Sequence, residues 1–328
     1  MIQLSENKIK LNSPGKVNLH LAVGGKRDDG FHELTSIFAA LDFADTLIFS
    51  LLPGNEGQTV FTVQEEGPFL ELSQKGQVFP PIPAEKNMVY LASELFRSKT
   101  GFKKDLSIEL IKRIPPGSGM GGGSSNAATT LLALNEHFNS NKNKIPKQEI
   151  LEMAAQLGSD VPFFIEIGLP DAQKSPHLIS SCARAVGGRG EIINFLPAPP
   201  SWGILLAFPG FASHTSAAFN LLDKNSSGLT KKARTNSLLS KDFFWDFPDN
   251  WDYSNDFEEL FLQFGPEREK ETYRTMLADL KNAGASFTGL SGSGSACFGV
   301  FSGYEEALKA EKALGGVFYV LKSTFFLR

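Results

Sequence analysis

The chain has 328 residues, and its 32 Lys and Arg against 36 Asp and Glu give a formal net charge of −4. A content of 41% hydrophobic and 21% charged residues is that of a globular chain and excludes wholesale disorder. The slight negative charge argues against a nucleic-acid-binding surface, and a total of two cysteines excludes a disulfide scaffold and a multi-cysteine zinc site.

Membrane insertion and secretion are not expected from this sequence. The first residues contain no apolar core of signal-peptide length. The longest apolar runs, such as residues 204–208, are much shorter than the ~18 residues that a membrane-spanning helix requires. We therefore expect a cytoplasmic protein that does not bind membranes.

Strand and helix patterns alternate along the first half of the chain. In chain order they predict a strand over 8–24, a turn at 27–30, a mixed apolar stretch over 34–49, an irregular excursion over 53–86, a helix over 87–97 and a strand over 106–111. A glycine-dense loop over 115–126 leads into a helix ending near 138, and a second helix over 147–157 stops at Gly158. A polar turn then enters an apolar strand over 159–164.

The pattern restarts beyond residue 168. It predicts strands over 191–196 and 202–208, a polar irregular stretch over 223–254, a helix over 268–282 and a second glycine-rich loop over 288–295. We therefore expect an α+β fold with two domains, residues 1–168 and 169–328.

The glycine-dense loop carries the strongest chemical signal. Five of the seven residues 117–123 are glycine, which allows backbone N–H groups to approach an anion closely. A helix N-terminus follows and adds unpaired N–H donors with partial positive charge. A tight turn with a serine N-cap is the structural alternative, but such a turn does not need five glycines. The pattern therefore favours phosphate binding.

The sequence patterns of better-known phosphate-binding loops do not match this segment. Gly117-x-Gly119-x-x-Gly122 matches the dinucleotide fingerprint, but no acidic residue follows at the usual offset of about 20 residues. No lysine precedes Ser124, so there is no Walker A motif. His-Arg-Asp, Asp-Phe-Gly and Gly-x-Ser-x-Gly are also missing, which argues against a protein kinase and a serine hydrolase.

Three segments together resemble the GHMP kinase superfamily, which includes galactokinase, homoserine kinase and mevalonate kinase. They are Ser13–Leu19, the loop at 115–126, and Leu290–Ser295. The resemblance implies a two-domain GHMP kinase fold, with an N-terminal domain like ribosomal protein S5 and an α/β C-terminal domain.

Further segments resemble one family of that superfamily, the 4-diphosphocytidyl-2-C-methyl-D-erythritol kinases. They are Asp29–Leu34, Gly121–Ala128, Leu157–Phe163, Gly188–Glu191 and Asn255–Glu258. Three positions depart from the family pattern: Phe31 replaces Tyr, Met120 replaces Leu, and Lys86 replaces a common Asp. The resemblance implies ATP-dependent phosphorylation of the substrate's 2-hydroxyl, in the non-mevalonate route to isoprenoid precursors.

Roles for individual residues follow from the same resemblance. Asp160 would accept the proton of the alcohol, and Lys16 would offer a cation to the transferring phosphoryl group. Mg²⁺ would arrive with ATP, held by phosphates and Ser124, since the protein has no metal site of its own. The ATP phosphates would bind to Pro115, Pro116, Gly117, Ser118, Gly119, Met120, Gly121, Gly122, Gly123, Ser124 and Ser125, and the cytidylyl substrate to Asn18, Phe31, His32 and Phe208.

Three alternatives remain at this point. They are another small-molecule GHMP kinase, a non-catalytic nucleotide sensor on the same fold, and an RNA-binding module. The negative charge counts against the last. We expect ATP and a small cytidylyl substrate as partners, no nucleic acid, and a monomer or weak homodimer.

Overall fold

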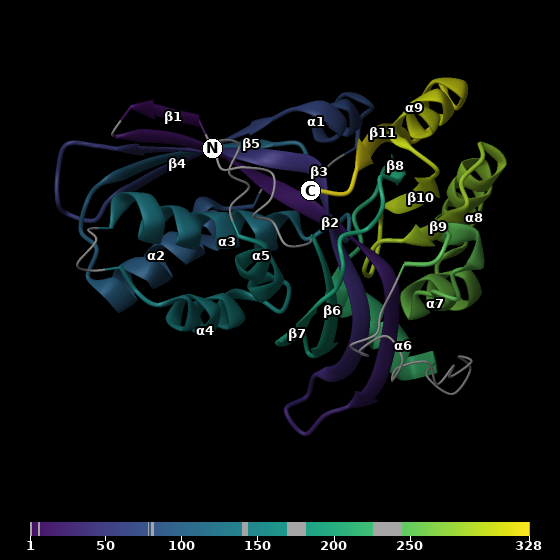
Figure 1. Ribbon diagram of the computed structural model, residues 1–328, viewed down its shortest axis with the longest axis horizontal. Helices are drawn as coiled ribbons and strands as arrows, with labels where there is room; N and C mark the ends of the chain where they lie inside the picture. The colour runs from purple at the N-terminus through teal and green to yellow at the C-terminus, as the bar shows by residue number, and fades with distance from the viewer. Residues whose placement is uncertain are drawn as a thin grey trace.

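The computed structural model describes residues 2–5, 7–77, 79, 82–139, 144–168, 182–225 and 245–327. Two sheets lie beside each other, one built mainly from the first half of the chain and one from the second (Figure 1). No helix within the described ranges is long and apolar enough to cross a membrane. The α+β class expected from the sequence is confirmed.

The first sheet has seven strands in the order β1-β2-β3-β5-β4, with β6 pairing with β3 and β7 with β6. Strands β2 and β3 form a long antiparallel hairpin whose tip projects from the body of the molecule (Figure 1). The bounds are β1 (Ile2–Ser5), β2 (Lys8–Lys26), β3 (His32–Leu51), β4 (Thr59–Glu65), β5 (Leu106–Lys112), β6 (Ala183–Gly188) and β7 (Ile192–Phe195).

Helices cover both faces of this sheet. The group on one face comprises α2 (Met88–Thr100), α3 (Gly122–Ala133), α4 (Lys147–Leu157) and α5 (Val161–Ile167), whereas α1 (Gly67–Gln74) lies on the other face (Figure 1). Helix α2 shows clear end signals: the Asn87 side chain accepts from the N–H of Val89, and Gly101 ends the helix with a φ of 72°. The short helices are η1 (Ala84–Lys86), η2 (Leu134–Phe138) and η3 (Pro248–Asn250).

The second sheet is antiparallel with the order β11-β8-β10-β9. Its central strand β8 (Gly203–Phe208) is buried on both faces: Leu205 and Ala207 pack in the core of the second half, whereas Leu206 and Phe208 pack in the core of the first. The other elements are α6 (Thr215–Asn225), α7 (Asp256–Phe264), α8 (Glu267–Asn282), β9 (Phe287–Leu290), β10 (Cys297–Phe301), α9 (Tyr304–Ala313) and β11 (Val320–Phe325).

Residues 161–164, predicted as a strand, form the start of helix α5 instead. This run is buried on every side, and periodicity cannot distinguish a short buried strand from a short buried helix. The excursion at 53–86, predicted to be irregular, contains β4, α1 and η1.

The first sheet also continues past residue 168, where the domain boundary was expected, because β6 pairs with β3. Much of the polar stretch at 223–254 lies outside the described residues.

The carboxylate of Asp45 joins three elements of the first half. It is fully buried on β3 and accepts from Lys112 Nζ at 2.6 Å and from the backbone N–H groups of Arg113 and Ile114 at 2.7 and 2.8 Å. Asn126 Nδ2 on α3 donates to it at 3.0 Å. A single carboxylate thus fixes the end of β5, where the glycine loop begins, to both β3 and α3.

We predict that Asp45→Asn destabilises the protein by roughly 3 kcal/mol, because it leaves the Lys112 ammonium without its buried partner and directs a second donor at the existing ones. Urea unfolding followed by circular dichroism measures the change. Glu94→Gln is the matched control, since the Glu94–Arg97 pair is partly exposed and costs at most about 1 kcal/mol to remove. Equal losses of unfolding free energy in the two variants would contradict the stabilising role that we assign to Asp45.

Candidate active site

A cleft of about 490 Å³ opens between the glycine loop at the start of α3, strand β2, helices α5 and α6, and the loop after β9. Its lining combines the two glycine-rich loops with polar side chains that reach in from β2, α5 and α6. These lining residues include Lys16, Asn18, Pro115–Ser124, Asn126, Asp160, Thr215, Phe219, Gly292 and Ser293.

Lys16 is the buried cation of this cleft. Its side chain is 3% exposed, and its Nζ lies 3.5 Å from Asp160 Oδ2, bonds to Asn18 Oδ1 and sits 4.6 Å from the ring centre of Phe38. Burial lowers the pKa of the Lys16 ammonium below its usual value, although the nearby Asp160 carboxylate acts in the opposite direction. The site therefore holds an ammonium whose positive charge is only partly compensated.

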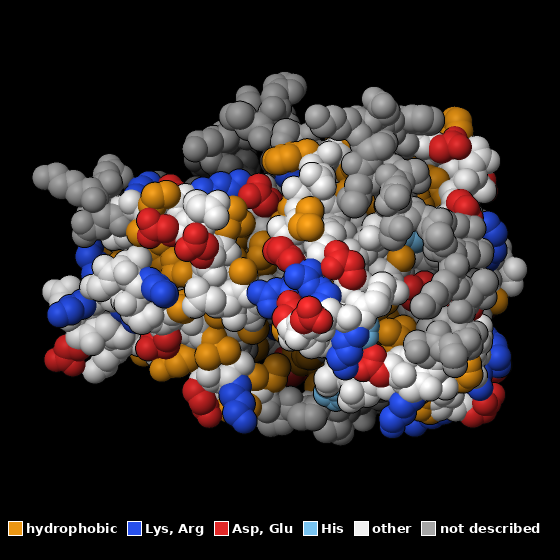
Figure 2. Space-filling view, turned by 90° about the horizontal axis from the view of Figure 1, so that it is seen from below, with side chains coloured by type: hydrophobic (Ala, Val, Ile, Leu, Met, Phe, Trp, Pro, Cys, Tyr) orange, Lys and Arg blue, Asp and Glu red, His pale blue; other side chains and the backbone are white. Residues whose placement is uncertain are grey.

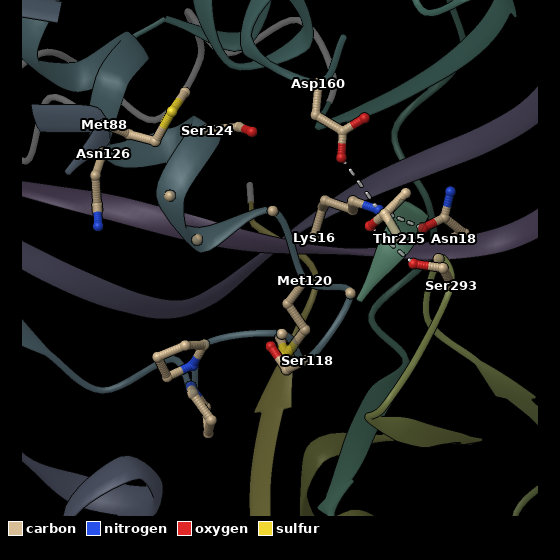
Figure 3. A pocket seen from close by; sticks show the side chains of 18 of the residues that line it. Lys16, Asn18, Met88, Ser118, Met120, Ser124, Asn126, Asp160, Thr215 and Ser293 are labelled. Atoms are coloured by element: carbon tan, nitrogen blue, oxygen red, sulfur yellow. Dashed lines mark hydrogen bonds and ion pairs between the residues drawn. The ribbon is translucent and has the colours of Figure 1, made fainter. Parts of the chain in front are cut away.

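Asp160 lies at the N-cap position of α5, but its side chain makes no capping hydrogen bond. The carboxylate is 31% exposed and points across the cleft at Lys16 (Figure 3). A capping or turn aspartate, the ordinary role of such a residue, would use its oxygens on the helix. This carboxylate is instead available to a bound molecule.

The glycine loop has the backbone geometry that the sequence predicts. Gly117, Gly119 and Gly121 adopt φ values of +66°, +73° and +67°. A Cβ on Gly119 would come within 2.0 Å of the Ser291 carbonyl oxygen, so the two glycine loops pack backbone against backbone. Because Gly121 caps α3 without a side chain, the first-turn N–H groups of α3 are left for an anion.

Ser125 was predicted to bind phosphate, but the structure turns it away from the cleft. Its side chain is fully buried and accepts a hydrogen bond from Ser13 Oγ at 2.8 Å, while its backbone N–H donates to the Gly121 carbonyl. Consecutive helical residues point about 100° apart, so Ser124 lines the cleft and Ser125 joins α3 to β2. The other residues from Pro115 to Ser124 line the cleft as expected.

Phe208, predicted to stack on a pyrimidine, is a core residue. It is 1% exposed, and its ring centre lies 6.0 Å from that of Phe43 between the two sheets. Three aromatic rings line the cleft: Phe38 and Phe257 are buried, and Phe219 on α6 is the partly exposed one. No pattern in the sequence singles out Phe219, because it fits the apolar face of an ordinary amphipathic helix.

Asn18 and His32 were both predicted to bind the substrate, and they lie in and beside the cleft, respectively. Asn18 lines the cleft and donates to Ser36 Oγ at 2.9 Å. The His32 ring stacks on Phe219 with centres 5.1 Å apart and planes at 21°, and its Nε2 lies 2.8 Å from Asp223 Oδ1.

Phe31 lies at the hairpin tip and is 48% exposed, with the Arg189 guanidinium 5.0 Å from its ring centre. Acidic and basic side chains gather beside one another on the face seen in Figure 2, and the ion pairs of Arg27 with Glu33 and Glu191 belong to this tip. This cluster ties the hairpin tip to the turn between β6 and β7.

The far end of the cleft is formed by α2 and the end of β5. Met88 and Asn126 mark it in Figure 3, opposite the Lys16–Asp160 pair. The exposed Lys86 lies in the lining next to Asn87. Among the described residues no group of His, Cys, Asp and Glu could hold a metal ion.

Comparison with known proteins agrees with this geometry. The family described as GHMP kinases N terminal domain matches residues 87–168, and GHMP kinases C terminal matches residues 249–320. A 4-diphosphocytidyl-2-C-methyl-D-erythritol kinase of Thermodesulfovibrio yellowstonii is 34% identical over 92% of each chain. One from Prochlorococcus marinus (strain AS9601) is 33% identical over 94% of this chain and 91% of its own.

Solved structures extend the comparison to the fold. A crystal structure of 4-(cytidine 5'-diphospho)-2C-methyl-D-erythritol kinase is 26% identical, covers 97% of this chain and 99% of its own, and has a TM-score of 0.67. Mevalonate kinase of Methanococcus jannaschii shares only the fold, with 13% identity, full coverage of both chains and a TM-score of 0.64. The chain is thus a member of the 4-diphosphocytidyl-2-C-methyl-D-erythritol kinase family within the GHMP kinases.

Proposed function

We propose that this chain transfers the γ-phosphoryl group of ATP to the 2-hydroxyl of 4-diphosphocytidyl-2-C-methyl-D-erythritol, a step of the non-mevalonate route to isoprenoid precursors. The observation that carries the proposal is the Lys16–Asp160 pair, 3.5 Å apart, in the same cleft as the glycine loop. Family membership supports this choice of substrate and of ATP as donor.

Phosphoryl transfer requires positioned reactants and compensation of phosphate charge more than covalent help from the protein. The first-turn N–H groups of α3 and the glycine-rich backbone of residues 117–123 supply donors for the phosphates. Lys16, whose backbone N–H donates to the Met120 carbonyl of this loop at 2.9 Å, adds a positive charge beside them. Two neighbouring sources of positive potential are thus available to the phosphates of ATP.

Asp160 is the group that receives the proton of the attacking alcohol. Its carboxylate is free of helix capping and partly exposed, so a substrate hydroxyl can bond to it. The Lys16 ammonium next to it orients this carboxylate and stabilises charge on the transferring group. Asn18 holds Lys16 from the other side.

Mg²⁺ fits this site as an ion that enters with ATP. The cleft offers the oxygen ligands that Mg²⁺ prefers, the hydroxyl of Ser124 and the carboxylate of Asp160, but too few to hold the ion without phosphates. When bound, Mg²⁺ supplies further charge compensation for the phosphates.

The cytidine end lies around His32 and Phe219. Phe219 lines the cleft and is stacked against the His32 ring, so it offers a flat apolar surface to a pyrimidine. The ring nitrogen of His32 that does not face Asp223 adds a hydrogen-bonding group for the base edge. We place the enzyme in the cytoplasm as a monomer or weak homodimer, in keeping with the sequence prediction.

We predict that Asp160→Asn lowers kcat by about 10²–10⁴-fold, the usual weight of a catalytic base, while ATP binding stays within a few-fold of wild type. ADP release measures turnover with the cytidylyl substrate, mevalonate and homoserine, and a fluorescent ATP analogue measures binding. Turnover of mevalonate or homoserine instead would assign a different GHMP kinase activity. ATP binding without turnover of any of them would favour a nucleotide sensor.

The pH dependence of kcat/KM should report the charge of Lys16. Because burial lowers the pKa of this ammonium, activity should fall as pH rises through a value below that of an ordinary lysine. Lys16→Arg keeps its charge throughout this range, so its residual activity should lack the alkaline fall. An identical alkaline limb in both proteins would assign it to another group.

We predict that Phe219→Ala raises the KM for the cytidylyl substrate about 10-fold, because base stacking is worth roughly 1–3 kcal/mol, and leaves the KM for ATP unchanged. Phe208→Leu is the matched control: it should lower stability without a selective effect on either KM, because Phe208 is enclosed in the core. The reverse result would restore Phe208 to the cytidine pocket.

A further inference from the structure

The segment at residues 254–258, where α7 begins, contacts the strand that carries the catalytic lysine. The backbone N–H of Leu21 donates to the Ser254 carbonyl at 2.8 Å, and that of Val23 donates to Asp256 Oδ2 at 2.7 Å. Leu21 and Val23 lie on β2, the strand of Lys16 and Asn18. The start of α7 is therefore anchored to one wall of the cleft.

Asn255 connects this anchor to the second glycine loop. Its Nδ2 donates to the carbonyls of Leu290 and Gly292 at 2.7 and 2.8 Å, and its Oδ1 accepts from the N–H of Phe257 at 2.9 Å. The side chain is 7% exposed and uses both amide hydrogens on the loop. Glu258 Oε2 accepts from the N–H of Leu290 at 2.8 Å and holds the same strand end.

Gly292, the residue held by Asn255, packs against the catalytic centre. A Cβ added to it would lie 3.3 Å from both Lys16 Nζ and Asn18 Oδ1, and its φ is +55°. The neighbouring Ser291 Oγ donates to the Gly119 carbonyl at 3.1 Å. A shift of Gly292 therefore changes the space around the Lys16 amine and the fit against the first glycine loop together.

We propose that Asn255 is a positioning residue for phosphoryl transfer: its amide holds the Gly292 carbonyl so that the second glycine loop keeps Lys16 and Asn18 in place. Asn255 is not among the residues that line the cleft, so it acts through Gly292. The inference rests on the proposed function and extends it to a residue behind the reacting groups.

Two substitutions separate this role from helix capping. Asn255→Ser and Asn255→Asp both keep an oxygen that can cap α7, with Asp the more favourable because it also suits the positive end of the helix. Both lack the two N–H donors, and Asp directs a negative oxygen at two carbonyl oxygens. Positioning thus predicts that Asp is the more damaging change, whereas capping alone predicts that Asp resembles wild type.

The test measures kcat and KM for ATP and for the cytidylyl substrate well below the unfolding temperature. We expect kcat to fall at least about 10-fold in Asn255→Ser and further in Asn255→Asp, with each KM within about 3-fold, because a displacement of reacting groups near 1 Å costs up to about 10²-fold in rate. Thermal unfolding is measured in parallel.

Tyr319→Phe is the control for lost stability, because it removes the Tyr319–Asp279 hydrogen bond of 2.7 Å in the second half without touching the cleft. Its kcat should equal that of wild type. Unchanged kcat in both Asn255 variants, or a loss no greater than in Tyr319→Phe at equal destabilisation, would overturn the inference and leave the proposed function intact. An inactive wild type would instead contradict the proposed function.

Discussion

The buried carboxylate of Asp45 is the constraint on which the first half of the chain depends. An unpaired charge at that depth would cost several kcal/mol, so its position is possible only while Lys112, two backbone N–H groups and Asn126 surround it. Two of these donors belong to residues 113 and 114, immediately before the glycine loop. The first glycine loop thus starts from residues whose positions are fixed by hydrogen bonds, although five of the seven residues 117–123 are glycine.

The fixed position of residues 113 and 114 helps to order the loop that follows, because glycine-rich loops lose much conformational entropy when they become ordered. The first loop is held further by the second: Ser295 and Ala296 donate their N–H groups to the carbonyls of Gly117 and Ser118 at 3.0 and 3.1 Å. Their contact brings backbone from both halves of the chain to the same cleft. The geometry of the two glycine loops therefore depends on both halves of the chain.

Local chemistry made much of this fold predictable from the sequence. Helix α2 has its cap at Asn87 and its stop at Gly101, and the first glycine loop has a composition that few other structures require. The short apolar run at 161–167 carried no such signal, because a segment buried all round has no polar face to reveal its period. The regular elements within 53–86 were obscured by the prolines and glycines between them.

The candidate site likewise contains residues that the sequence predicts and residues that only the packing of the fold determines. Lys16, Asp160 and the loop from Pro115 to Ser124 occur in contiguous motifs, and all of them line one cleft. The choice between Phe208 and Phe219 depends on which strand face meets which core, and this is decided by the packing of β8 between the two sheets. Similarly, only the direction of the first turn of α3 separates Ser124 in the cleft from Ser125 against Ser13.

The balance of positive and negative charge in the cleft indicates which kind of ligand would fit it. Lys16 is buried, and the one carboxylate of the described residues within ion-pair distance of it is partly exposed and 3.5 Å away, so the ammonium is not fully compensated in the free protein. An anion between Lys16 and the N-terminus of α3 would supply the missing compensation, and the cost of burying the ammonium would then be offset by binding rather than by folding. A second buried carboxylate would have stabilised the free protein and competed with phosphate. The incomplete ion pair is thus a feature that favours the phosphorylated ligand of the proposed function.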